Sequence, residues 1–137
     1  MFIDPTTPDE ISRIIRSLDK NKSAGYDEIS VAALQSLNPK INTPLACIIN
    51  NMIETGIYPD SLKEGIVVPI PKCVNAREKE DFRPITILSS INKVVETVLN
   101  QRLENYLDKI GIMDKNQFGF VKKSSCEPPI MELNHLA

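Results

Sequence analysis

The chain has 137 residues, of which 42% are hydrophobic and 25% charged, values typical of a globular protein and not of a disordered one. This length is close to the commonest domain size, so we expect one domain over residues 1–137 or a part of a larger one. The net charge of −2 lacks the basic balance of most stand-alone nucleic-acid binders. Any surface that binds nucleic acid must therefore be local.

Cysteine spacing and hydropathy indicate in which compartment the protein resides. Three widely separated cysteines and the single histidine, His135, argue against a zinc site and against a disulfide framework. No apolar run approaches the roughly 18 residues of a membrane span, and the N-terminus lacks the design of a signal peptide. We predict an intracellular protein without a membrane partner, in either the cytoplasm or the nucleus.

The first predicted helix begins at a capping pattern. Thr7 can cap the helix, Pro8 suits its first position, and Glu10 three residues after the cap completes a capping box. Apolar residues at helical spacing follow, namely Ile11, Ile14, Ile15 and Leu18.

Two more helices are predicted before residue 60. A polar loop over residues 20–28 leads to a short helix over residues 29–37, for which Asp27 is a candidate structural cap. Thr43-Pro44 repeats the capping pattern of the first helix, and Gly56 stands where a C-terminal cap glycine belongs. The apolar stripe between them comprises Leu45, Ile48, Ile49, Met52 and Ile53.

A β-hairpin is predicted in the middle of the chain. Residues 66–70 form a β-branched run, and residues 82–88 form a second strand candidate after a charged connection over residues 72–81. Pro69 and Pro84 confine these strands to sheet edges. The fold class is therefore α+β, mainly helical, with one antiparallel hairpin.

The clearest helical pattern follows the hairpin. Ser89 or Ser90 can cap this helix, and Gly111 can end it. One face carries Ile91, Val94, Val95, Val98, Leu99, Leu103, Tyr106, Leu107 and Ile110. A loop over residues 117–125 and a helix opening near Pro129 complete the prediction.

Two cations, Lys72 and Arg83, flank the connection of the hairpin. A hairpin would bring both side chains toward one another despite their separation in sequence. Lysine acts as a point charge, whereas the planar arginine fork can bind phosphate oxygens bidentately. On spacing alone, two solvated charges at strand ends are the commoner explanation.

Four segments, in this order and across nearly the whole chain, resemble the reverse transcriptase of non-LTR (LINE-like) retrotransposons. They are residues 22–29 (KSAGYDEI), 54–72, 82–96 and 117–120 (QFGF). The resemblance implies the N-terminal fingers part of a right-hand polymerase and an incomplete palm. It also implies synthesis of DNA on an RNA template, with a DNA primer, deoxynucleotide triphosphates and Mg²⁺.

The resemblance implies roles for particular residues. It places Lys72 and Arg83 on the triphosphate of the incoming nucleotide. On the template side, Lys22 and the Lys122-Lys123 pair could meet phosphates, and Phe118 and Phe120 could stack on bases. The alternatives are a solvated loop for Lys22 and a place in the core for the two phenylalanines.

The acidic residues of the family's catalytic site have no counterpart in the sequence. In the family the first catalytic aspartate lies beyond the fourth segment, and the second acidic site is a Tyr-x-Asp-Asp turn, but this chain contains no Asp-Asp pair. We therefore expect no catalytic residue and no bound Mg²⁺ in this chain, and we expect the remainder of the polymerase as its partner. The alternatives are a transposon-derived nucleic-acid-binding remnant and a non-functional product of a decayed element.

Overall fold

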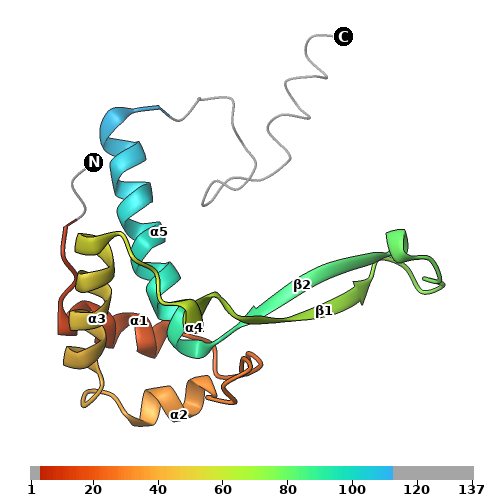
Figure 1. The fold of residues 1–137 in the computed structure, drawn as a ribbon, viewed down its shortest axis with the longest axis horizontal. Helices are drawn as coiled ribbons and strands as arrows, with labels where there is room; N and C mark the ends of the chain where they lie inside the picture. The colour runs from red at the N-terminus through yellow and green to blue at the C-terminus, as the bar shows by residue number, and fades with distance from the viewer. Residues whose placement is uncertain (1–3, 113–137) are drawn as a thin grey trace, which may run out of the picture. The chain divides into compact units, whose positions relative to one another are not determined.

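The computed structural model describes residues 4–112, which combine helices with one two-stranded antiparallel sheet (Figure 1), so the predicted α+β class is confirmed. In chain order the elements are α1 (Pro8–Ser17), α2 (Val31–Ser36), α3 (Asn42–Thr55), α4 (Asp60–Lys63), β1 (Gly65–Pro71), the 3₁₀ turn η1 (Lys79–Asp81), β2 (Phe82–Leu88) and α5 (Ser90–Ile110). The chain divides into two units after Arg102, and the core and the hairpin both belong to the first.

The hydrophobic core is built by the apolar faces of α1, α2, α3 and the first half of α5. Its buried members are Ile11, Ile14, Ile15, Leu34, Leu45, Ala46, Ile49, Met52, Val94, Val95 and Val98. Burying one such aliphatic side chain contributes about 1.5–3 kcal/mol. Because the hairpin contributes none of these residues, the helices supply most of the hydrophobic stabilisation.

Helix α1 begins at the predicted cap. The Thr7 Oγ1 accepts a hydrogen bond from the Glu10 amide at 3.2 Å. The Glu10 carboxylate also accepts from Thr6 Oγ1 at 2.8 Å and from both terminal nitrogens of Arg102, in α5, at 2.8 and 2.7 Å. The Arg102 and Glu10 side chains are only 13% and 15% exposed. The bidentate bond to this largely buried guanidinium is charge-assisted and therefore strong.

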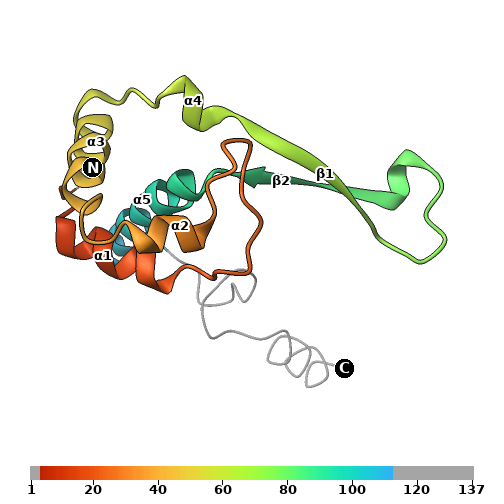
Figure 2. The ribbon, with the colours of Figure 1, turned by 90° about the horizontal axis from the view of Figure 1, so that it is seen from below.

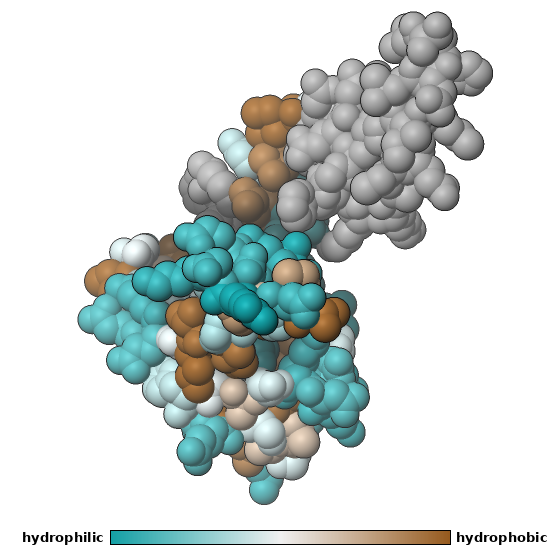
Figure 3. All heavy atoms as spheres, turned by 90° about the vertical axis from the view of Figure 1, so that its right-hand side faces the viewer, coloured by the Kyte–Doolittle hydropathy of each residue, from teal (hydrophilic) through white to brown (hydrophobic). Residues whose placement is uncertain are grey.

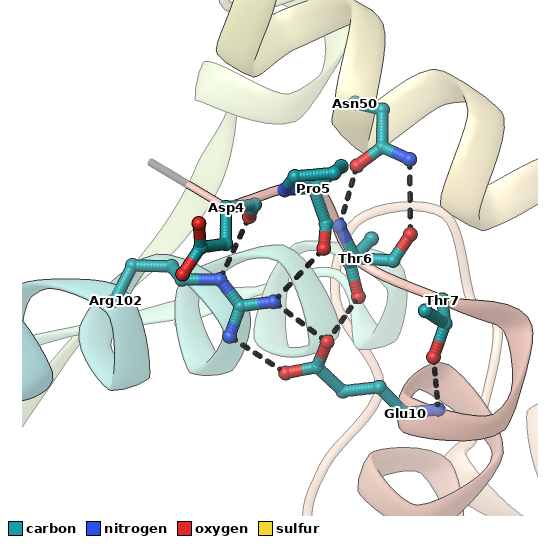
Figure 4. A network of polar contacts seen from close by, with 7 residues as sticks. All are labelled: Asp4, Pro5, Thr6, Thr7, Glu10, Asn50 and Arg102. Atoms are coloured by element: carbon teal, nitrogen blue, oxygen red, sulfur yellow. Dashed lines mark hydrogen bonds and ion pairs between the residues drawn. The ribbon is translucent and has the colours of Figure 1, made fainter. Parts of the chain in front are cut away.

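Residues 4–6 form an N-terminal strap that is tied to two helices (Figure 4). Arg102 also donates from Nε to the Asp4 carbonyl at 2.9 Å. On the other side, the Asn50 side chain of α3 accepts from the Thr6 amide at 2.7 Å and donates to the Thr6 carbonyl at 3.0 Å. The strap therefore links α3 to α5 through the extended backbone that precedes α1.

The next two helices differ from the prediction at their starts. Helix α2 is capped by Ser30, whose Oγ accepts from the Ala33 amide at 3.1 Å. The prediction that Thr43 caps α3 is wrong, because α3 starts at Asn42 without a side-chain cap. The chain enters α3 from a helical turn, with Ile41 already in the right-handed region, so no extended cap residue is present. Gly56 ends α3 with a φ of 69°, as predicted.

The predicted hairpin is present, with β1 and β2 paired antiparallel and extending away from the helices (Figures 1 and 2). Pro69 lies directly opposite Pro84. The hydrogen bond from the Lys72 amide to the Asp81 carbonyl at 2.7 Å sets the alternation of bonded and non-bonded pairs, and it places the two prolines in a non-bonded pair. Their missing N–H groups thus fall on the free edges, where they cost no ladder bond.

Helix α5 begins and ends as predicted. Ser89 is the cap, since its Oγ accepts from the Asn92 amide at 3.1 Å, whereas Ser90 donates from its Oγ to the Ile29 carbonyl at 2.7 Å. Gly111 follows the helix with a φ of 60°. The predicted apolar stripe divides along its length: Val94, Val95 and Val98 are buried, while Leu103, Tyr106 and Ile110 are exposed. Within residues 4–112 no helix has both the length and the apolar character needed to span a membrane.

Candidate functional site

The register of the hairpin brings Lys72 and Arg83 onto one face. Directly opposed residues share a face, and faces alternate along each strand. Arg83 lies opposite Ile70, and Lys72 continues the ladder opposite Asp81. Lys72 and Arg83 are therefore diagonal neighbours on the same face, a separation of about 7–8 Å that long side chains can bridge.

The two cations are held differently. Lys72 is exposed, and its Nζ donates to the Glu80 carbonyl across the turn. Arg83 is also exposed, and its side chain makes no hydrogen bond or ion pair with the other residues in the described part of the chain. One face at the far end of the hairpin therefore presents a lysine whose ammonium is bonded to the turn and an arginine whose guanidinium is open to solvent.

Asp81 organises the turn between the strands, a role that we did not predict. Its carboxylate accepts from the Arg77 amide at 2.9 Å and from the Glu78 amide at 3.1 Å, and with Glu78 it forms a reciprocal capping box around η1. These backbone hydrogen bonds, that from Arg77 first, hold the pKa of Asp81 below its ordinary value. The acidic residues three apart in Glu78-x-x-Asp81 are the sequence signal that could have revealed this box.

The hairpin also exposes apolar side chains on both faces. Ile66, Ile70 and Ile85 share the face of the two cations, and Val67 lies on the other. That opposite face has a shallow hollow of about 350 Å³ lined by Pro69, Lys79, Phe82 and Pro84. Figure 3, which faces the far end of the hairpin, shows apolar surface among polar side chains. A two-stranded hairpin of this kind gains little stability by itself.

The loop of residues 20–28 is held by contacts with α4 and with the start of α5. Lys93 donates from Nζ to the Ser23 carbonyl at 2.9 Å, and the Tyr26 hydroxyl donates to the Ser61 carbonyl. Gly25 is buried so closely that an added Cβ would lie 2.7 Å from the Cα and N of Ser89. A glycine is therefore required where the loop passes over the junction of β2 and α5.

Lys22 and Asp27 occupy different parts of this loop. Lys22 is exposed, and its amide donates to the Asp19 carbonyl at 3.3 Å. The Asp27 carboxylate accepts from the Ile29 amide at 3.2 Å and so has a local structural role, but the prediction that Asp27 caps the helix is wrong, because Ser30 caps α2.

Four further predicted site residues follow residue 112. Phe118, Phe120, Lys122 and Lys123 lie outside the described residues. Within residues 4–112, no three His, Cys, Asp or Glu side chains are grouped so that they could hold a metal ion. The described part of the chain therefore does not fit a Mg²⁺ site.

Comparison with known proteins defines a class of polymerase. No family model matches the chain. Three relatives from Drosophila melanogaster match most of it: the probable RNA-directed DNA polymerase from transposon X-element (32% identical over 88% of the chain), the one from transposon BS (33% over 86%), and the RNA-directed DNA polymerase from mobile element jockey (26% over 86%). The chain spans only 13% of the length of each.

These matches extend over helices, hairpin and loop together, because each covers more than four fifths of the chain. The chain is thus a relative of RNA-directed DNA polymerases of mobile elements. Within that class it belongs with the reverse transcriptases of non-LTR retrotransposons, of which it matches one segment.

Proposed function

We propose that this chain is the fingers part of a right-hand RNA-directed DNA polymerase and that its hairpin contacts the incoming deoxynucleotide triphosphate. The observation that carries the proposal is the placement of Lys72 and Arg83 as diagonal neighbours on one exposed face. The polymerase relatives make a nucleotide the natural ligand for such a pair. An RNA template and a DNA primer would be the other partners.

The chemistry of the pair suits a triphosphate. Nucleotide addition transfers a phosphoryl group, and cations around the phosphates stabilise the charge that develops on their oxygens. The Arg83 fork, which has no partner among the described residues, can bind two phosphate oxygens at once. The Lys72 ammonium, kept near the turn by the Glu80 carbonyl, adds a compact charge beside it. The hairpin thus binds and neutralises the triphosphate.

The loop of residues 20–28 would serve the template side of the same site. Its attachment through Gly25 and Lys93 gives it a defined position, and Lys22 is exposed there to meet a phosphate backbone. Within the proposal, Phe118, Phe120, Lys122 and Lys123 extend these template contacts. Mg²⁺, the cofactor expected for the family, supplies Lewis-acid chemistry when bound to carboxylates, but the described residues do not offer such a set.

The test uses a polymerase in which this sequence is followed by a catalytic palm, assayed for RNA-templated extension of a DNA primer. Arg83→Ala and Lys72→Ala should each lower kcat/KM for the nucleotide by about 10–200-fold, the effect of losing one charge-assisted hydrogen bond. Lys79→Ala is the matched control, because Lys79 is an exposed cation of the same turn that lines the hollow on the opposite face. Equal, small effects of all three substitutions would show that Lys72 and Arg83 are only solvated charges.

A further inference from the structure

Asp81 is hydrogen-bonded both to the turn of the hairpin and to Lys72, and it lies two residues before Arg83. Its carbonyl accepts the Lys72 amide at 2.7 Å, and its carboxylate accepts the amides of Arg77 and Glu78 on the far side of the turn. Arg83 follows two residues later on the same face. The neighbouring Glu80 carbonyl accepts the Lys72 ammonium, so the shape of this turn also sets the position of that charge.

We propose that Asp81 is a positioning residue for a phosphate-binding pair formed by Lys72 and Arg83, an inference that rests on the proposed function. The carboxylate closes the turn, and the closed turn aligns the end of the ladder from which both cations project. Two backbone N–H groups that converge on one carboxylate oxygen hold a turn as an N-terminal cap holds a helix. Without the carboxylate, residues 77–81 lose this constraint, and the two cations lose their fixed separation.

Electrostatics alone predicts the opposite effect. A carboxylate at the same end of the hairpin as the two cations repels a phosphate, so its removal should tighten phosphate binding. Glu80 provides the comparison: it is adjacent, exposed and acidic, and its side chain makes no hydrogen bond or ion pair with the other described residues. Positioning and simple charge therefore predict changes of opposite sign for Asp81→Ala, whereas Glu80→Ala reports charge alone.

The experiment uses the 137-residue chain, with ¹⁵N-labelled arginine, and inorganic tripolyphosphate without metal at low ionic strength, where charge interactions are least screened. The five arginines include Arg77 and Arg83 in the hairpin and two in α1, Arg13 and Arg16, whose signals report whether the core remains folded. Affinity is measured from the shifts of the Arg83 signals and from the ³¹P spectrum of the ligand. The Arg77 amide shift reports its hydrogen bond to Asp81.

We expect Lys72→Ala and Arg83→Ala to weaken binding by about tenfold. Asp81→Ala should weaken it by about threefold to tenfold and move the Arg77 amide signal, with the α1 signals unchanged. Asp81→Asn should restore most of the affinity, because its amide oxygen can accept the same two N–H groups. Glu80→Ala should leave the Arg77 signal in place and tighten binding by no more than about threefold.

Two different failures are distinguishable. If the unsubstituted chain binds no tripolyphosphate, or if Lys72→Ala and Arg83→Ala leave its affinity unchanged, the proposed function is overturned. If those two variants lose affinity but Asp81→Ala tightens binding as Glu80→Ala does, the phosphate-binding pair of Lys72 and Arg83 stands and the positioning role of Asp81 is overturned.

Discussion

Gly25 shows how one residue can fix the position of a functional loop. An added Cβ would lie 2.7 Å from two backbone atoms of Ser89, and a backbone cannot yield as a flexible side chain does. We therefore expect Gly25→Ala to lower the free energy of unfolding by about 1–3 kcal/mol. Urea denaturation followed by circular dichroism would measure this loss.

Gly56 provides the control for this substitution. Its φ is +69°, but an added Cβ would meet no atom within 4 Å, so Gly56→Ala carries the cost of backbone conformation alone, about 1 kcal/mol. An unchanged stability of the Gly25→Ala variant would show that the loop does not pack on the junction of β2 and α5 as described.

At the scale of elements, the Glu10–Arg102 pair joins the start of α1 to α5. The hydrogen bonds from Arg102 are the main reason that the pKa of Glu10 lies below its ordinary value of 4.5, and the Thr6 hydroxyl adds to this against the effect of burial. Because the folded state binds the Glu10 proton more weakly than the unfolded state, the stabilisation is complete above pH 4.5. It is lost as the pH falls below that value and through the lowered pKa.

Substitution of the arginine tests this connection. Arg102→Met should lower the free energy of unfolding by about 1–3 kcal/mol at neutral pH, because it leaves a partly buried carboxylate without its partner.

Urea midpoints measured from neutral to acidic pH should fall more steeply for the native chain than for Glu10→Gln. Parallel curves for the two proteins would contradict the lowered pKa of Glu10.

Local sequence patterns predicted most of the elements. Helical periodicity and capping residues located α1 and α5, and β-branched runs located the hairpin, because these signals act between residues close in the chain. The Glu10–Arg102 bond and the Asn50 contacts with Thr6 were not predictable in this way. The residues of each contact are brought together only by helix packing, so their spacing in the sequence does not indicate that they interact.

The candidate site also combines features that the sequence predicted with features that it did not. The sequence pointed to Lys72 and Arg83, and the ladder register then explains why they share a face. The close packing of Gly25 against Ser89 depends on a contact between distant segments and was not predicted. The nucleotide and template roles of these residues remain predictions, because they concern ligands and not the fold.

At the scale of the whole molecule, apolar side chains lie exposed on both the hairpin and α5. Ile66 and Val67 are 44% and 60% exposed, and Leu103 is 46% exposed. In a polymerase such surfaces would pack on further parts of the protein, so the purified chain should bind a hydrophobic dye, associate, or unfold at low denaturant. Dye fluorescence and sedimentation would detect this. A monomer with a sharp unfolding transition and no dye binding would instead behave as a self-sufficient domain.

Primer extension on an RNA template, with Mg²⁺ and all four deoxynucleotide triphosphates, most directly tests the claim that this chain contributes nucleotide contacts but no catalytic carboxylates. The purified 137-residue chain should extend no primer above a buffer control, because it lacks an Asp-Asp pair and residues 4–112 hold no group of metal ligands. The same sequence followed by a catalytic palm should extend the primer. Template-dependent extension by the 137-residue chain itself would contradict the account.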